Sequence, residues 1–280
     1  MRQDEKLAEI LAPIPPLDKD GTLTGPAWED AIKVFDAVLE GGKDRVAALA
    51  GMVQEPDDGR DYKARYALHG LAQYLGRPGK EAPRAVYCEA LAGQLGGEIA
   101  KGAKGFLARQ LQVIGGRECA AALGKLLGDA ELHEYAAQAL LAIRAGAAEE
   151  FRRALPGLKG AARLTAVQAL GVLRDAESVE ALRQAAGEED ADLRVVAAWA
   201  LANIGDAASV DAVLRAGDAE PGWARIKATS ACLLLGERLA AAGKKPEAAR
   251  VYRHLKETRK DDSEGYVRAL AEEALAALGG

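Results

Sequence analysis

Aromatic residues are scarce in this sequence. They make up 5% of the 280 residues, although hydrophobic residues make up 49%. Most of the apolar content is therefore alanine, leucine and valine. Alanine and leucine favour helices, whereas strands are enriched in aromatic and β-branched residues. Charged residues reach 28%, and together with the apolar content this excludes an intrinsically disordered chain. The composition predicts closely packed helices.

Cysteines are also few, and long apolar runs are missing. Cys88, Cys119 and Cys232 lie far apart, and none of them has CxxC spacing. Their odd number argues against a disulfide framework, so we expect buried thiols that act as small apolar side chains. The sequence contains no stretch of about 18 apolar residues, so it predicts no transmembrane helix. Residues 1–12 lack the apolar core of a signal peptide, which favours a cytoplasmic location; export stays open if a native signal peptide was trimmed.

A surplus of positive charge is missing as well. The formal net charge is −5, which disfavours nucleic acid as a partner because nucleic-acid binders present a broad basic surface. The one basic run, from Lys244 to Lys260, is diluted by Glu247 and Glu257. We expect this run to be a solvated helix face, and contact with an acidic partner is the alternative.

Motifs of catalysis and metal binding are missing too. No serine stands in a Gly-x-Ser-x-Gly elbow, and no glycine-rich phosphate loop follows a strand pattern. His133 and Glu134 form a single His-Glu pair, and one histidine is a weak basis for a metal site. The sequence therefore predicts no catalytic residue, no cofactor and no metal.

What the sequence does contain is an internal repeat. Residues 163–216 contain two copies of one repeat unit, offset by about 31 residues, and further copies align before and after them. A fixed period of this size indicates stacked helical hairpins that share one core. One residue in the first helix of each unit serves as its anchor: Leu71, Leu111, Leu140, Leu170, Leu201, Cys232 and Leu275.

Small residues recur beside these anchors. Four positions before them stand Ala67, Leu107, Ala136, Ala166, Ala197, Ala228 and Ala271. Positions i and i+4 share one face of a helix, so the pattern predicts a face that a neighbouring helix approaches closely. We expect glycines after the first helices to supply left-handed caps, at Gly115, Gly205, Gly236 and Gly279.

The best-matched unit runs from Arg194 to Val213 and contains Ala200-Leu201, Ile204-Gly205-Asp206 and Ser209-Val210. This pattern resembles the HEAT-like repeats first grouped with phycobilisome lyases. The resemblance implies an all-α fold, a right-handed α-solenoid (superhelix) of helix pairs with the second helices on the concave side. We expect an N-terminal arm with a short helix (1–27), adapting or capping helices (28–60) and a HEAT-like solenoid of about seven units, the last one a cap (61–280).

A basic column stands seven positions before the anchors, at the first turn of each first helix: Lys104, His133, Arg163, Arg194, Arg225 and Arg268. The resemblance implies an inter-repeat ladder, in which each side chain bonds carbonyls or carboxylates of an adjacent loop. The alternative is a row of cations for an anionic ligand. A helix N-terminus is already electropositive, so a cation there needs a local partner, which favours the ladder.

Trp199 is the residue of this stretch that the repeat does not require. Its column is otherwise polar and faces away from the core, so Trp199 either covers a gap or anchors a partner. We expect Trp28 and Trp223 to pack over helix ends. The second helices present polar side chains and charges of both signs, including Glu180, Gln184, Asp211 and Arg215.

These features favour a monomeric, non-catalytic scaffold or adaptor. It would bind a protein or peptide on the concave face through Glu180, Gln184, Asp211 and Arg215, with Trp199 as a second contact. The alternative is a lyase-like or enzyme-accessory module that holds a small molecule in the groove. HEAT-like repeats serve many functions, so the sequence leaves the identity of the partner and the pathway open.

Overall fold

The computed structural model describes residues 3–21, 24–55 and 59–279. Within these ranges the chain forms α-helices and short 3-10 helices, and no strand. The predicted all-α solenoid fold is confirmed. The chain divides into two compact units, Met1–Leu158 and Lys159–Gly280. The boundaries predicted at residues 27 and 60 stay predictions.

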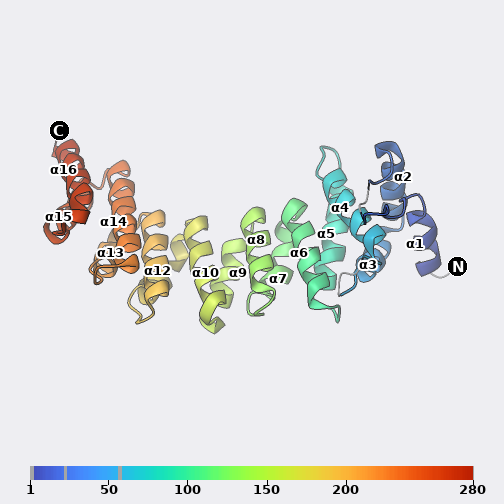
Figure 1. The fold of residues 1–280 in the computed structure, drawn as a ribbon, viewed down its shortest axis with the longest axis horizontal. Coiled ribbons are helices and arrows are strands. Elements are labelled where there is room, and N and C mark those ends of the chain that lie inside the picture. Colours follow the sequence, from blue (N-terminus) through green and yellow to red (C-terminus); the bar gives the residue numbers. More distant parts are fainter. Residues whose placement is uncertain (1–2, 22–23, 56–58, 280) are drawn as a thin grey trace. The chain divides into compact units, whose positions relative to one another are not determined.

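The described part of the first unit contains nine α-helices. They are α1 (Gln3–Leu11), α2 (Trp28–Leu39), α3 (Gly42–Gly51), α4 (Tyr62–Leu75), α5 (Glu81–Leu95), α6 (Lys101–Ile114), α7 (Arg117–Gly124), α8 (His133–Ile143) and α9 (Ala147–Ala154). The first helices α4, α6 and α8 pack side by side, and the second helices α3, α5, α7 and α9 form the other layer (Figure 1). This is the two-layer stacking that the period predicts.

The described part of the second unit contains seven α-helices. They are α10 (Gly160–Leu173), α11 (Val179–Ala185), α12 (Ala191–Ile204), α13 (Val210–Gly217), α14 (Trp223–Ala241), α15 (Lys245–Thr258) and α16 (Gly265–Gly279). The first helix α12 packs against both α10 and α14, and α13 packs against α12 and α14 (Figure 1). At the C-terminal end α15 packs on α14, and α16 packs on α15.

The core consists of the columns predicted from the sequence. All seven residues four positions before the anchors are completely buried, and so are the first six anchors. Leu275, the last anchor, is only half-buried. Its helix α16 packs on α15, and no later helix of the described chain covers its other side.

The predicted glycine caps are wrong at three of four positions. Gly205 ends α12 with φ 79°, whereas Gly115 has φ −58° and Gly236 and Gly279 lie within helices. Gly236 instead permits close packing, because a Cβ there would lie 2.6 Å from the ring of Tyr252. Two arginines at other helix ends have positive φ, Arg144 (61°) and Arg174 (52°), and Arg174 adopts the left-handed helical conformation.

The repeat is irregular where the two units meet in sequence. Helix α9 ends at Ala154, and a 3-10 helix (Leu155–Gly157) follows. Pro156 has no backbone N–H, so it cannot continue the α-helix here. Helix α10 then opens the second unit.

Candidate functional site

The leading candidate for a functional site is a groove between three first helices of the second unit. We call it the tryptophan groove. Its volume is about 410 Å³, and its lining residues are Gln168 of α10, Val195, Val196 and Trp199 of α12, and Trp223, Lys227 and Ser230 of α14. The packing of α10, α12 and α14 side by side brings these residues together (Figure 1). Two indoles, two valines, one ammonium and two small polar groups therefore share one open hollow.

Trp199 covers a gap and lines the groove as well. A Cβ on Gly171 of α10 would lie 2.8 Å from Cζ3 of Trp199, so the indole occupies space that Gly171 leaves free. This packing leaves Trp199 half-buried, with part of the ring on the groove. The packing role that the sequence left open is therefore present, and contact with a partner stays a prediction.

Trp223 differs from its prediction. It is the first residue of α14 and is 54% exposed, so it does not pack over a helix end. Ile226, one turn later, is 60% exposed. Trp28 does pack, because its ring lies edge-on to Phe35 at 6.1 Å and carries the Arg77 guanidinium 4.6 Å above it. An exposed Trp223 leaves large apolar surface at the rim of the groove.

The four predicted residues on the second helices lie on the surface of α11 and α13. Glu180 forms an ion pair of 3.1 Å with Arg183, and Asp211 forms an ion pair with Arg250 of α15. Gln184 and Arg215 are exposed. None of the four lines the tryptophan groove. Glu180 lines a separate hollow of about 500 Å³ together with Arg183 and Lys244.

Arg183 connects neighbouring repeats. Its Nε donates to Ser209 Oγ at 2.9 Å, and its Nη2 donates to Asp206 Oδ2 at 3.1 Å. Burial raises the pKa of Asp206, but the hydrogen bonds from Ser209 and Arg183 outweigh it and hold the pKa below its ordinary value. Arg183 therefore stabilises the turn before α13, and its charge is already paired.

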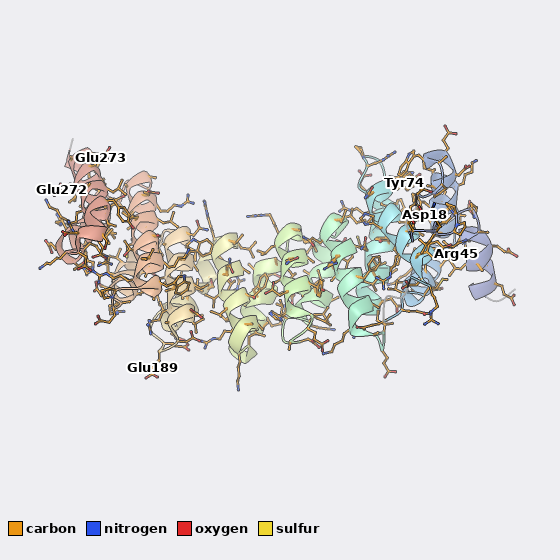
Figure 2. The ribbon with its side chains drawn as sticks, viewed as in Figure 1. Asp18, Arg45, Tyr74, Glu189, Glu272 and Glu273 are labelled. Carbon is orange, nitrogen blue, oxygen red and sulfur yellow. The ribbon has the colours of Figure 1, made fainter. Side chains whose placement is uncertain are left out.

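The arginines of the basic column bond loops, as a ladder requires. Arg163 forms a two-point ion pair with Glu188, with Nη1 to Oε2 at 2.8 Å. Arg194 donates to the carbonyls of Glu188 at 3.0 Å and of Glu189 at 2.8 Å; Figure 2 labels Glu189 on the loop before α12. Arg268 donates to two carbonyls of the loop between α15 and α16, at 2.6 and 2.9 Å.

The remaining members of the column differ from one another. Arg225 donates to both carboxylate oxygens of Glu264, at 2.7 and 3.0 Å, and both side chains are 15% exposed. His133 Nδ1 lies 3.2 Å from the carbonyl oxygen of Ala130. Lys104 makes no hydrogen bond or ion pair with any residue in the described ranges. The four arginines and His133 therefore contact loop residues and, in the described part of the chain, Lys104 does not, and the inter-repeat ladder stays a prediction.

Arg259 is a residue whose role sequence reasoning missed. The sequence places it in a basic run that we expect to be solvated, but its side chain is 0% exposed. Nη2 donates to the carbonyl of Gly217 at 2.6 Å, and Nε donates to Thr229 Oγ1 at 3.0 Å. Burial lowers the pKa of Arg259, although a guanidinium keeps its proton in proteins. The prediction of a solvated face is wrong at this position.

Comparison with known proteins supports the repeat fold. Residues 153–233 match the family model described as HEAT repeats. The match spans less than half of the chain and confirms the predicted resemblance for these residues. No curated protein matches the chain. None of the described helices has the length and hydropathy that a membrane span requires.

Several solved structures are similar to the chain. The complex of CpcE and CpcF of phycocyanin lyase from Nostoc sp. PCC7120 is 16% identical, with a TM-score of 0.42, and covers 94% of this chain and 100% of that chain. A designed armadillo repeat protein in complex with peptide (KR)4 is 17% identical, with a TM-score of 0.36, and covers 82% and 99%. An engineered protein is 21% identical, with a TM-score of 0.33, and covers 84% and 96%. At these scores the similarities carry no functional conclusion.

Proposed function

We propose that this chain, whose residues 153–233 are HEAT repeats, is a non-catalytic scaffold or adaptor that binds a protein or peptide segment. The observation that carries the proposal is the tryptophan groove, in which Trp199 and Trp223 share one open hollow. Tryptophan is enriched among the residues that contribute most to binding energy in protein interfaces.

The lining of the groove indicates the chemistry of the bound segment. Val195, Val196 and the two indoles favour a large aliphatic or aromatic side chain. Lys227 places an ammonium beside this apolar surface, so it favours a carboxylate next to the apolar residue. Exposed Ile226 adds apolar surface on the same helix. The proposed ligand is therefore a peptide segment with an apolar anchor and an acidic neighbour.

The second helices are the proposed additional contact surface. Glu180, Gln184, Asp211 and Arg215 are exposed and carry both charge signs. The ion pairs of Glu180 with Arg183 and of Asp211 with Arg250 lie on the surface. Exposed pairs of this kind contribute only about 0–1 kcal/mol, so a partner with complementary charges can replace them.

A lyase-like or enzyme-accessory module remains the alternative function. Such a module needs a concave pocket that buries most of a small molecule, with a few convergent polar groups. The tryptophan groove and the hollow at Glu180 are both open to solvent. Open hollows of this kind favour a polypeptide over a small molecule, and the proposal is non-catalytic for that reason.

The experiment selects ligands for the full chain from a random peptide library. Selected peptides are purified, and their affinities are measured by fluorescence anisotropy for the wild type and for Trp199→Ala, Trp223→Ala and Trp28→Ala. We expect sequences with an aromatic or aliphatic residue beside Asp or Glu. Loss of a groove tryptophan should weaken binding roughly 30-fold, the size of a hot-spot effect. Equal affinities for Trp223→Ala and Trp28→Ala would contradict the groove.

Charge reversal tests the second-helix surface separately. The triple variant Glu180→Lys, Asp211→Lys, Arg215→Glu should bind the selected peptides or a captured partner more weakly, while its far-UV circular dichroism stays unchanged. Unchanged affinity in a folded triple variant would remove these residues from the proposed interface and leave the groove as the binding site.

A further inference from the structure

Two buried thiols of the first unit lie next to each other. Cys88 lies on α5 and Cys119 on α7, which pack side by side (Figure 1). Both residues are 0% exposed. Their Sγ atoms and a carboxylate oxygen of Glu118 all lie within 4.8 Å of one another. Cys119 follows Cys88 by 31 residues (119 minus 88), and the two cysteines lie on the second helices of successive repeats.

A backbone amide and a guanidinium lie beside this cluster. Gly116 N–H donates to Glu118 Oε1 at 3.1 Å. The positive charge of Arg84, one turn before Cys88 on α5, acts on both thiols.

We propose that Cys88, Cys119 and Glu118 form a binding site for one Zn²⁺ ion. Cysteine thiolate and carboxylate oxygen are established zinc donors. A tetrahedral ion with Zn–S distances of about 2.3 Å holds its sulfur ligands roughly 3.8 Å apart, so small side-chain rotations bring donors at the observed spacing onto the ion. Hard ions such as Mg²⁺ disfavour sulfur, and the two thiols therefore select a thiophilic metal.

Charge and access also fit this ion. Zn²⁺ replaces the two thiol protons, which now point to the carbonyl oxygens of Ile114 at 3.7 Å and of Cys88 at 3.8 Å. Two thiolates and one carboxylate carry three negative charges, and Zn²⁺ neutralises two of them. The positive charge of Arg84 offsets the one negative charge that is left. Glu118 is exposed, so the ion enters from its side, and water takes the fourth position there.

The test uses the reduced full chain and Cd²⁺ as a spectroscopic probe. Cd²⁺ bound to thiolate gives a charge-transfer band in the ultraviolet, and added Zn²⁺ should displace it. We expect one Cd²⁺ per chain in the wild type and in Cys232→Ser, because Cys232 is equally buried but lies in the second unit. Cys88→Ser and Cys119→Ser should lose the band. A wild type without the band, or a Cys88→Ser variant that keeps it, overturns the proposal.

Folding and the third ligand need their own controls. Ser178 and Ser209 occupy the position of Cys119 in other repeats and are buried, so Cys119→Ser should keep the fold, as far-UV circular dichroism will show. Glu118→Gln keeps both sulfurs and should retain the band, but its affinity for Zn²⁺ should fall by at least the roughly 10- to 100-fold that loss of an outer-shell partner costs. Unchanged affinity in this variant overturns the three-ligand site.

Discussion

At the scale of single residues, Arg259 has the largest side chain that is completely buried among the described residues. Its guanidinium joins three segments, because it bonds Gly217 at the end of α13, Thr229 on α14 and the neighbouring Thr258. Glu264 lies 3.6 Å away and supplies a negative charge. A buried charge of this kind is tolerated only where its donors are paired.

Arg259→Ala should strongly destabilise the second unit. The substitution leaves the Gly217 carbonyl and the Thr229 hydroxyl without their donor and removes a large buried side chain, so we expect a loss of about 3 kcal/mol or more. Lys260→Ala, next to it but exposed, should change the stability by about 0.5 kcal/mol or less. Urea denaturation followed by circular dichroism measures both. Equal denaturation midpoints would show that the Arg259 network contributes nothing.

The Arg225–Glu264 pair predicts a dependence of stability on pH. Hydrogen bonds from Arg225 hold the pKa of Glu264 below its ordinary value of 4.5. A depressed carboxyl pKa stabilises the fold above pH 4.5, and this stability is lost as the pH falls through the lower folded pKa. Arg225→Ala should therefore cost about 2 kcal/mol at neutral pH, and the difference should shrink below pH 4.5. A difference that stays constant between pH 7 and pH 3 would contradict the pair.

The sequence predicts some of these residues better than others. Arg163, Arg194 and Arg268 recur at the repeat period, and a cation at a helix N-terminus needs a local partner, so their loop contacts follow from the pattern. Arg259 stands in a run of charged residues, and its burial depends on three separate segments meeting around it. Trp223, which is 54% exposed, has no such periodic signal either, because no other repeat has a tryptophan at its position.

At the scale of elements, close approach between first helices depends on small residues. A Cβ on Gly171 would lie 2.7 Å from the Cα of Ala200 and 2.8 Å from the ring of Trp199. The backbone of α12 cannot move away without disturbing the rest of its packing. Gly171 therefore determines both the distance between α10 and α12 and the position of the Trp199 indole on the groove.

Gly171→Ala should destabilise the protein although alanine is the better helix former. Overpacking typically costs about 1–3 kcal/mol, more than the roughly 1 kcal/mol that alanine gains over glycine in a helix. Gly93 of α5 is the matched control, because it is helical and a Cβ there meets nothing within 4 Å. Gly93→Ala should stabilise by up to about 1 kcal/mol. Denaturation midpoints that move in the same direction would refute this packing argument.

The helix ends show why element boundaries are harder to predict than element faces. The alanine column is buried because spacing along one helix determines which residues share a face. Which residue ends a helix, and in which backbone conformation, depends instead on the neighbouring helices that pack against that end. Gly236 lies within α14, where the Tyr252 ring of α15 packs against it, and the left-handed cap of α10 is an arginine, Arg174, where no glycine cap was predicted.

At the scale of the whole molecule, stability in stacked repeats comes mainly from nearest-neighbour contacts. In the second unit α10 packs on α12, α12 on α14, α14 on α15 and α15 on α16, and the chain divides into two compact units. A destabilising substitution in one helix should therefore increase local unfolding around that helix. The protection of distant helices against hydrogen exchange should stay unchanged.

Hydrogen exchange of Gly171→Ala, followed by mass spectrometry, tests this expectation. Exchange should accelerate in α10 and α12 of the second unit, while α4 and α6 of the first unit keep the wild-type rates. Uniform acceleration along the chain would instead indicate that both units open as one cooperative body.

The fold follows from the sequence because the repeat fixes the period, the buried face and the helix pairing. The groove does not follow, because it depends on how three first helices pack and on where the indoles of Trp199 and Trp223 come to lie. Trp199 can be identified as an exception to its column, but its partner on α14 appears only in three dimensions.

The most direct test of the proposed scaffold is the affinity of one selected peptide for Trp223→Ala relative to Trp28→Ala, at equal temperature and salt. Both substitutions remove a partly exposed indole, but only Trp223 lines the groove. Binding at the groove predicts a ratio of roughly 30 in dissociation constants, with Trp28→Ala close to the wild type. A ratio near one, with both variants folded, would contradict partner binding at this site.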